Sequence, residues 1–105
     1  MLVVTTDNIP GREITETLGL CRGNVVRAKH VGSDIIASLR NLVGGEVNEY
    51  TQLISAAREQ ALDRMIDEAR SMGADAVIGM RFTTSQIAQG GAEILAFGTA
   101  VKLES

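Results

Sequence analysis

The chain contains no tryptophan, one tyrosine, two phenylalanines, one cysteine and one histidine in 105 residues. So few aromatic side chains leave little to stack on nucleic-acid bases. A net charge of −3, with acidic and basic residues interspersed, provides no basic face either. A single cysteine cannot form an intrachain disulfide, which is typical of a reducing compartment. We therefore expect no nucleic-acid partner and no disulfide framework.

Long apolar runs are also missing. No stretch approaches the roughly 20 apolar residues that a membrane-spanning helix needs. The first residues, MLVVTTDNIPG, lack the basic and apolar regions of a signal peptide. We therefore expect a cytoplasmic protein with no membrane partner. Its length and its 45% hydrophobic content are those of one domain, which covers residues 1–105.

The first third of the chain reads as β-structure. Residues 1–6 are rich in β-branched side chains, and residues 7–12 contain Asp, Asn, Pro and Gly, a composition that favours a turn. We predict a hairpin at this point. Residues 13–29 are rich in Thr, Val and Leu but are interrupted by Gly19 and Gly23, so we predict two strand pieces separated by a bulge or a bend.

Two helices are predicted in the middle of the chain. The first covers residues 33–43 and ends at Gly44. The second runs from Asn48 to Met72, because apolar residues recur there at helical intervals, and Gly73 is a natural stop. Its apolar stripe is rich in alanine, which lets another element approach closely. Its other side carries charges that we interpret as a solvated face: Arg58, Glu59, Asp63, Arg64, Asp67, Glu68 and Arg70.

The last third of the chain predicts a β-hairpin. Residues 76–87 and 92–104 have the pattern of two strands, and Gly90 and Gly91 connect them. The second strand carries apolar side chains on both of its faces. One face has Leu95, Phe97, Val101 and Leu103, and the other has Ile94, Ala96, Gly98 and Ala100.

Together these elements predict an α+β fold in the order β-β-α-α-β-β, with a small, mostly antiparallel sheet packed on one long and one short helix. The long helix can cover one face of the sheet. The face that bears Ile94, Ala96 and Ala100 then has no partner within so short a chain. We expect a homo-oligomer to cover this face. We expect a closed ring, because an open chain of the same contacts would grow into a fibre.

Four segments resemble the YbjQ-like family of small bacterial and archaeal proteins: TTDNIPG at 5–11, GGEVNEYTQLISAAREQAL at 44–62, GADAVIGMRF at 73–82 and GTAVKL at 98–103. The family is uncharacterised and is labelled "putative heavy-metal-binding". The resemblance covers nearly the whole chain. It implies an α+β subunit that assembles into a ring, most often a pentamer, and it implies no catalytic residues.

A metal site is the first candidate site. A closed zinc site takes about four thiolate or imidazole ligands, and this chain offers only Cys21 and His30. One subunit therefore cannot complete such a site, although copies of Cys21 or His30 from several subunits could meet in a ring. We favour the alternative, in which Cys21 is a small hydrophobic strand residue and His30 is a surface or capping residue.

A polar cluster is the second candidate site. Glu46, Tyr50 and Arg58 stand near the start of the long helix, and Arg81 leaves a strand on the face opposite Phe82. Tyr50 and Arg58 share a face of the helix because of their spacing. Such a cluster can bind a small anionic ligand or form an ion-pair network between subunits, and we favour the network.

The sequence lacks the residue arrangements that enzyme catalysis needs. The chain has a single histidine and no nucleophile elbow, and the neighbouring carboxylates Asp67 and Glu68 point apart on a helix. We predict no catalytic activity, and no cofactor is identified. The expected function is the binding of a metal ion or a small anionic ligand between subunits of the ring. The alternative is a structural or protein-interaction oligomer without a ligand.

Overall fold

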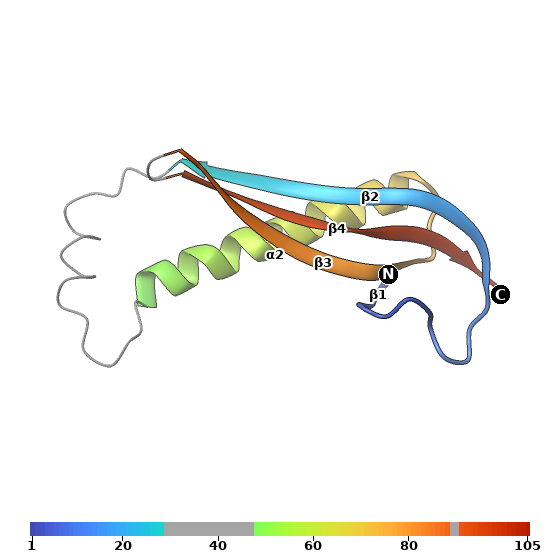
Figure 1. The fold of residues 1–105 in the computed structure, drawn as a ribbon. Helices are drawn as coiled ribbons and strands as arrows, with labels where there is room; N and C mark the ends of the chain where they lie inside the picture. The colour runs from blue at the N-terminus through green and yellow to red at the C-terminus, as the bar shows by residue number, and fades with distance from the viewer. Residues whose placement is uncertain (29–47, 89–90) are drawn as a thin grey trace.

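The computed structural model describes residues 1–28, 48–88 and 91–105, in which a four-stranded sheet packs on one helix (Figure 1). The elements are β1 (Leu2–Val3), β2 (Ile14–Ala28), α2 (Asn48–Ser71), β3 (Ala76–Ala88) and β4 (Gly91–Leu103). The strand order is β1-β3-β4-β2, with β1 parallel to β3 and the other pairs antiparallel. The predicted α+β class is confirmed. The order differs from the prediction, because the described part holds one helix instead of two; the helix predicted at 33–43 lies outside the described residues.

The predicted hairpin at the start of the chain is wrong. β1 pairs with β3 at one edge of the sheet, whereas β2 forms the other edge. The predicted turn between them is present, since the N–H of Arg12 donates to the backbone O of Ile9 at 3.1 Å and Gly11 has a φ of 81°. The turn therefore leads across the end of the sheet instead of folding β2 back on β1.

β2 is one continuous strand where the sequence predicts two pieces. Its pairing with β4 shifts register next to Gly19, which has a φ of 124°, so a bulge lies at this glycine. The strand does not break at Gly23. A Cβ atom there would collide with the backbone of Ala61 and Met65 on α2, so Gly23 marks a close approach of the helix and not a bend.

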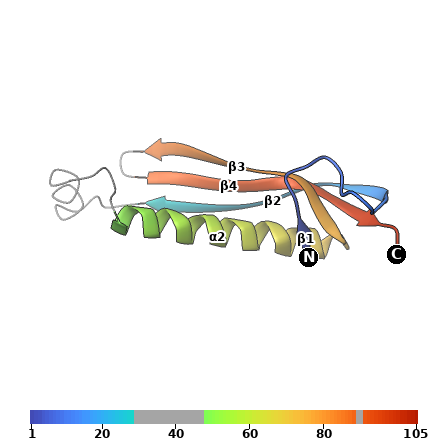
Figure 2. The same cartoon turned by 90° about the horizontal axis from the view of Figure 1, so that it is seen from below.

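α2 lies along one face of β2 and β4 (Figure 2). Its observed end at Ser71 agrees with the prediction to within one residue. Gly73 terminates it with a φ of 83°: the N–H of Gly73 donates to the O of Arg70 at 3.0 Å, and that of Ala74 donates to the O of Ala69 at 3.1 Å. The buried side chains between helix and sheet include Ala57, Ala61, Met65 and Ala69 of α2 and Cys21, Val25, Ile94, Ala96 and Ala100 of the strands.

The face of β4 that α2 covers is the one predicted to lack a partner. Ile94, Ala96 and Ala100 are all buried in this core. The reason is size: small strand residues allow the alanine stripe of α2 to pack close to the sheet. Leu95 and Phe97, on the other face of β4, are only half-buried.

The other face of the sheet is covered at one end only. There Ile9, from the segment before β2, packs with Ala76, Val101 and Leu103 in a second small core. No described element covers the rest of this face, which we call the open face. Register and alternation assign to it Leu20, Arg22, Asn24 and Val26 of β2, Glu93, Leu95, Phe97 and Thr99 of β4, and Arg81, Thr83 and Ser85 of β3. α2, the helix in the described part of the chain, does not have the apolar length that crossing a membrane requires.

Candidate functional site

Cys21 lies in the core between the sheet and α2 and is fully buried. Its Sγ donates a hydrogen bond to the backbone O of Gly98 at 3.6 Å. Burial raises the pKa of the Cys21 thiol, the charge of Glu68 raises it further, and backbone hydrogen bonds at Cys21 and Gly98 oppose these effects. The side chain is therefore a neutral thiol at neutral pH and not the thiolate that soft metals prefer.

The structure provides little for the candidate metal site. Across residues 1–28, 48–88 and 91–105, no group of three or more His, Cys, Asp and Glu side chains could hold a metal ion. His30 lies outside these ranges. Cys21 would have to leave the core to meet a copy of itself in a neighbouring subunit. Its position fits the predicted role of a small hydrophobic strand residue.

Within one subunit, the structure does not bring Arg81 of the predicted polar cluster together with Arg58. Tyr50 lies in the first turn of α2, and Glu46 lies outside the described residues. Arg58 is exposed on α2. Arg81 does lie on the face opposite Phe82, as predicted, but this is the open face. The sheet therefore separates Arg81 from the helix that carries Arg58.

Arg81 belongs instead to a row of three side chains across the open face. The register places Arg22 of β2 and Arg81 of β3 on either side of Phe97 of β4. The Nη1 of Arg81 donates to the backbone O atoms of Thr5 and Met80, at 2.8 Å each, which holds the guanidinium near the outer edge of β3. Arginine can bind a small anion through the planar fork of its guanidinium group, so Arg22 and Arg81 are the candidate anion-binding residues of this face. We call these three residues the arginine row.

Neither Arg22 nor Phe97 was among the predicted site residues. Their proximity depends on the pairing of β2 with β4, two strands from opposite ends of the chain, and local periodicity does not report this register. One pattern in the sequence does indicate the face on which Arg22 lies. Cys21 and Gly23 face the helix, so alternation alone turns Arg22, between them, to the other side of the sheet.

Side chains of α2 cap the outer edge of β2. Gln60, Arg64 and Glu68 follow one another at four-residue spacing and so share one side of the helix. The contacts are Arg27 Nη2 to Gln60 Oε1 (2.7 Å), Arg64 Nη1 to the O of Asn24 (2.6 Å) and the N–H of Arg22 to Glu68 Oε1 (3.2 Å). Free backbone groups on an edge strand invite another strand, so these contacts protect the edge. Arg64 and Glu68 are exposed, as expected of a solvated face, and they also bond to the backbone of β2.

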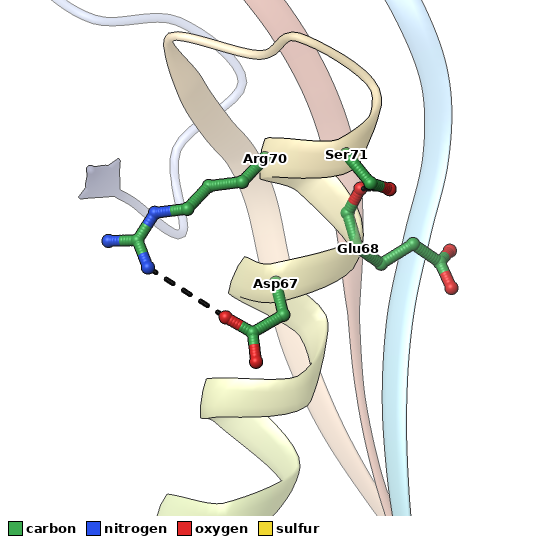
Figure 3. Close-up of polar contacts among 4 residues, drawn as sticks. All are labelled: Asp67, Glu68, Arg70 and Ser71. Carbon is green, nitrogen blue, oxygen red and sulfur yellow. Dashed lines mark hydrogen bonds and ion pairs between the residues drawn. The ribbon is translucent and has the colours of Figure 1, made fainter.

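The neighbouring carboxylates of Asp67 and Glu68 point apart, as predicted (Figure 3). Asp67 pairs with Arg70 at 3.8 Å, whereas the carboxylate of Glu68 turns toward β2. The Ser71 hydroxyl donates to the backbone O of Glu68 at 2.6 Å in the last turn of the helix. The two carboxylates therefore serve separate structural contacts and are not arranged as an acid–base pair.

The fold and the site define a small α+β domain whose sheet has one helix-covered face and one open face crossed by an arginine row. A family model described as "Putative heavy-metal-binding" matches residues 1–104. The chain is 61% identical to a UPF0145 protein of Halorubrum lacusprofundi and 60% identical to one of Photobacterium profundum, over 98% of this chain and 99% and 100% of those proteins. A UPF0145 protein of Archaeoglobus fulgidus is 57% identical over 98% of this chain and 95% of its own length. The chain therefore belongs to this family, as its resemblance to YbjQ-like proteins implies.

A solved structure supports the fold. The crystal structure of a protein of unknown function from Pediococcus pentosaceus, assigned to the DUF74 family, superimposes with a TM-score of 0.66 over 99% of this chain and 98% of that one. The two sequences are 14% identical, so the similarity is one of fold alone.

Proposed function

We propose that this protein is the subunit of a cytoplasmic homo-oligomeric ring that binds a small anionic ligand at a site shared between subunits and has no catalytic activity. The observation that carries the proposal is the open face with its arginine row. The number of copies in one ring, five, follows from the family resemblance and not from the geometry.

The exposure of apolar side chains supports self-association. Leu20 is 58% exposed and Val26 is 51% exposed, and both flank the half-buried Leu95 and Phe97 on the open face. Single exposed apolar residues are common on protein surfaces, but a group on one sheet face is typical of a surface that another molecule covers. A second copy of this chain is a suitable partner, because copies of the chain are always present together.

The arginine row supports an anion as the ligand. A subunit that covers the open face would remove the guanidinium groups of Arg22 and Arg81 from water, which is costly unless each is paired with negative charge. A phosphate or carboxylate group bound to either guanidinium would supply that charge. A metal ion, which the family description suggests, has less support, because Cys21 is buried in the core as a neutral thiol.

The same surface also favours the second candidate, an oligomer that carries no ligand. Carboxylates of a neighbouring subunit could pair with the arginine row, and the apolar residues around it would then form an ordinary subunit contact. The two candidates differ in whether the assembled protein retains or takes up a small anion.

Native mass spectrometry of protein purified without an affinity tag reports the number of copies and any retained ligand together. Calorimetric titration with inorganic phosphate and with zinc then tests the site in the assembled protein. We expect phosphate binding that Arg22→Gln/Arg81→Gln weakens by about tenfold or more, since each charge-assisted hydrogen bond contributes roughly 1.5–3 kcal/mol. Arg70→Gln, an exposed change on α2, is the control. A monomer at micromolar concentration would contradict the ring, and an oligomer that binds no phosphate would favour the ligand-free candidate.

A further inference from the structure

The two edges of the sheet differ in how they are protected. Side chains of α2 contact the outer edge of β2 at Arg22 and Asn24. The segment before β2 covers the edge of β3 only as far as Met80. There the N–H of Met80 donates to the O of Val4 at 3.0 Å, and that of Gly79 donates to the O of Thr6 at 2.8 Å. Beyond this point residues 81–86 are all exposed. No strand in the described part of the chain pairs with their outer side, which forms the edge of the sheet away from α2 (Figure 2).

The outer side of residues 82–86 of β3, which we call the free edge, has a composition that is typical of paired strands. Residues 82–86 read FTTSQ, which is rich in aromatic and β-branched side chains and contains no charge and no proline. It therefore carries no charge or proline that would keep another strand away, and the register shifts of β3 lie at the two ends of the run. The N–H of Met80 points to the outer edge, so alternation directs the backbone groups of Phe82, Thr84 and Gln86 to the same side. Each of these residues offers a donor and an acceptor to a further strand.

We propose that residues 82–86 of β3 pair with the same residues of a second copy of this chain, antiparallel and about a two-fold axis at Thr84. The inference rests on the proposed self-association and adds a defined contact to it. On the outer edge of β2, side chains of α2 occupy backbone groups of Arg22 and Asn24, which hinders a further strand there. Residues 82–86 of β3 have no such contact in the described part of the chain, so we take the same run of a second copy as the partner. Two identical strands related by a two-fold axis in a sheet are antiparallel.

The free run is complementary to itself. Thr84 lies at its centre, so the pairing places Thr84 opposite Thr84, Thr83 opposite Ser85 and Phe82 opposite Gln86. Thr–Thr and Thr–Ser pairs across antiparallel strands are favourable because their hydroxyl groups bond to one another. The run also fits in length, because a longer pairing would meet the segment that already covers Met80 of the partner.

The charges around the run are complementary as well. Arg81 is the one charged residue of β3. In the pair, the two Arg81 backbones lie about 20 Å apart at opposite ends of the contact. Glu93 lies beside Ser85 on the open face, about 12 Å from the backbone of the other copy's Arg81, which two extended side chains can bridge. Arg81 of one copy therefore lies closer to Glu93 of the other copy than to the other copy's Arg81.

This contact closes with two copies, so it does not by itself build a ring. Combined with ring contacts elsewhere on the subunit, it joins two rings face to face and doubles the number of copies. Disruption of the contact alone should therefore halve the mass of the assembly.

Disulfide trapping tests the register. Across the two-fold axis the Cα atoms of the two Thr84 residues lie about 5.5 Å apart, within the range of a disulfide. Those of Ser85 lie roughly 8 Å apart, which is too far. After mild oxidation we expect Thr84→Cys to give a covalent dimer on a non-reducing gel, whereas Ser85→Cys and the wild type, with its buried Cys21, stay single chains. No cross-link from Thr84→Cys, or equal cross-links from both variants, would overturn the proposal.

Thr84→Pro tests the contact without a cross-link. It removes an N–H that points to the free edge, a position at which a sheet tolerates proline. We expect an unchanged far-UV circular dichroism spectrum and, in sedimentation, half the wild-type mass. A folded Thr84→Pro variant with the full wild-type mass would refute the pairing while leaving the ring intact. A wild type that sediments as a single subunit would refute the proposed self-association itself.

Discussion

Gly23 of β2 lies against the backbone of Met65 on α2, so closely that not even a methyl group fits between strand and helix. The backbone O of Ala61 bounds the same spot. Cys21 and Val25, on either side of Gly23 along the strand, are buried in the core that this close approach creates. One glycine therefore sets the spacing between the two layers of the domain.

We expect Gly23→Ala to lower the free energy of unfolding by about 3 kcal/mol or more, because the methyl group meets backbone on two sides and neither side can move alone. Gly11→Ala is the control. No atom lies within 4 Å of a Cβ at Gly11, and its cost is the left-handed φ of 81°, about 1–2 kcal/mol. Urea unfolding followed by circular dichroism compares the two variants. Equal losses would mean that the helix yields easily at this contact.

The edge cap gives a second prediction. Glu68→Ala should lower the stability by about 1 kcal/mol, because the N–H of Arg22 loses its acceptor on an edge strand. Asp67→Ala, one residue away, should change it by less than about 0.5 kcal/mol, since its pair with Arg70 is largely exposed. Amide hydrogen exchange provides a local measurement. The Arg22 amide should exchange faster in Glu68→Ala and at the wild-type rate in Asp67→Ala, and unchanged exchange in both would argue against the cap.

The sequence predicts α2 almost to the residue because its signals are local. Apolar residues recur at helical spacing, and Gly73 supplies the left-handed stop. The choice of the covered sheet face is not local. Both faces of β4 are apolar, and only the packing of Ala96 and Ala100 against the alanines of α2 decides which one the helix takes. That match appears only once strand and helix are in register.

In the candidate site, too, local patterns predict some features and tertiary packing decides the others. The alternation of β3 correctly places Arg81 opposite Phe82. Its predicted grouping with Arg58 fails, because the side of the sheet on which α2 lies is a tertiary property. The arginine row needs the pairing of β2 with β4 as well, so Arg22 and Phe97 could not be joined from spacing along the chain.

The buried thiol of Cys21 predicts a dependence of stability on pH. Its folded pKa is raised above the ordinary value of 9.0, chiefly by burial, so the folded state holds the proton more tightly than the unfolded state. This contribution to stability is complete below pH 9.0 and is lost as the pH rises through the higher folded pKa. We expect the unfolding free energy of the wild type to fall relative to that of Cys21→Ala as the pH rises above this value. A difference between the two proteins that stays constant up to pH 11 would contradict the prediction.

Reagents that attack thiolates provide an independent measurement of the same property. Cys21 is fully buried and protonated, so an aromatic disulfide reagent at pH 8 should react with it only as fast as the protein unfolds. Urea at its midpoint concentration should restore rapid labelling. Labelling of the native protein at the rate of a free thiol would show that the core opens at β2.

Two adjacent residues of β4 separate folding from self-association. Ala96 is fully buried under α2, so Ala96→Glu places a carboxylate in the core and should cost several kcal/mol, enough to unfold the subunit. Phe97 lies on the open face between Arg22 and Arg81, which can pair with a new carboxylate. Phe97→Glu should therefore keep the fold, with a melting transition near that of the wild type, and should weaken any contact made through the open face. Circular dichroism and sedimentation of both variants distinguish the outcomes. If Ala96→Glu folds as a monomer, Ala96 is part of a subunit contact and not of the core; if Phe97→Glu keeps the full wild-type mass, the subunits associate without the open face.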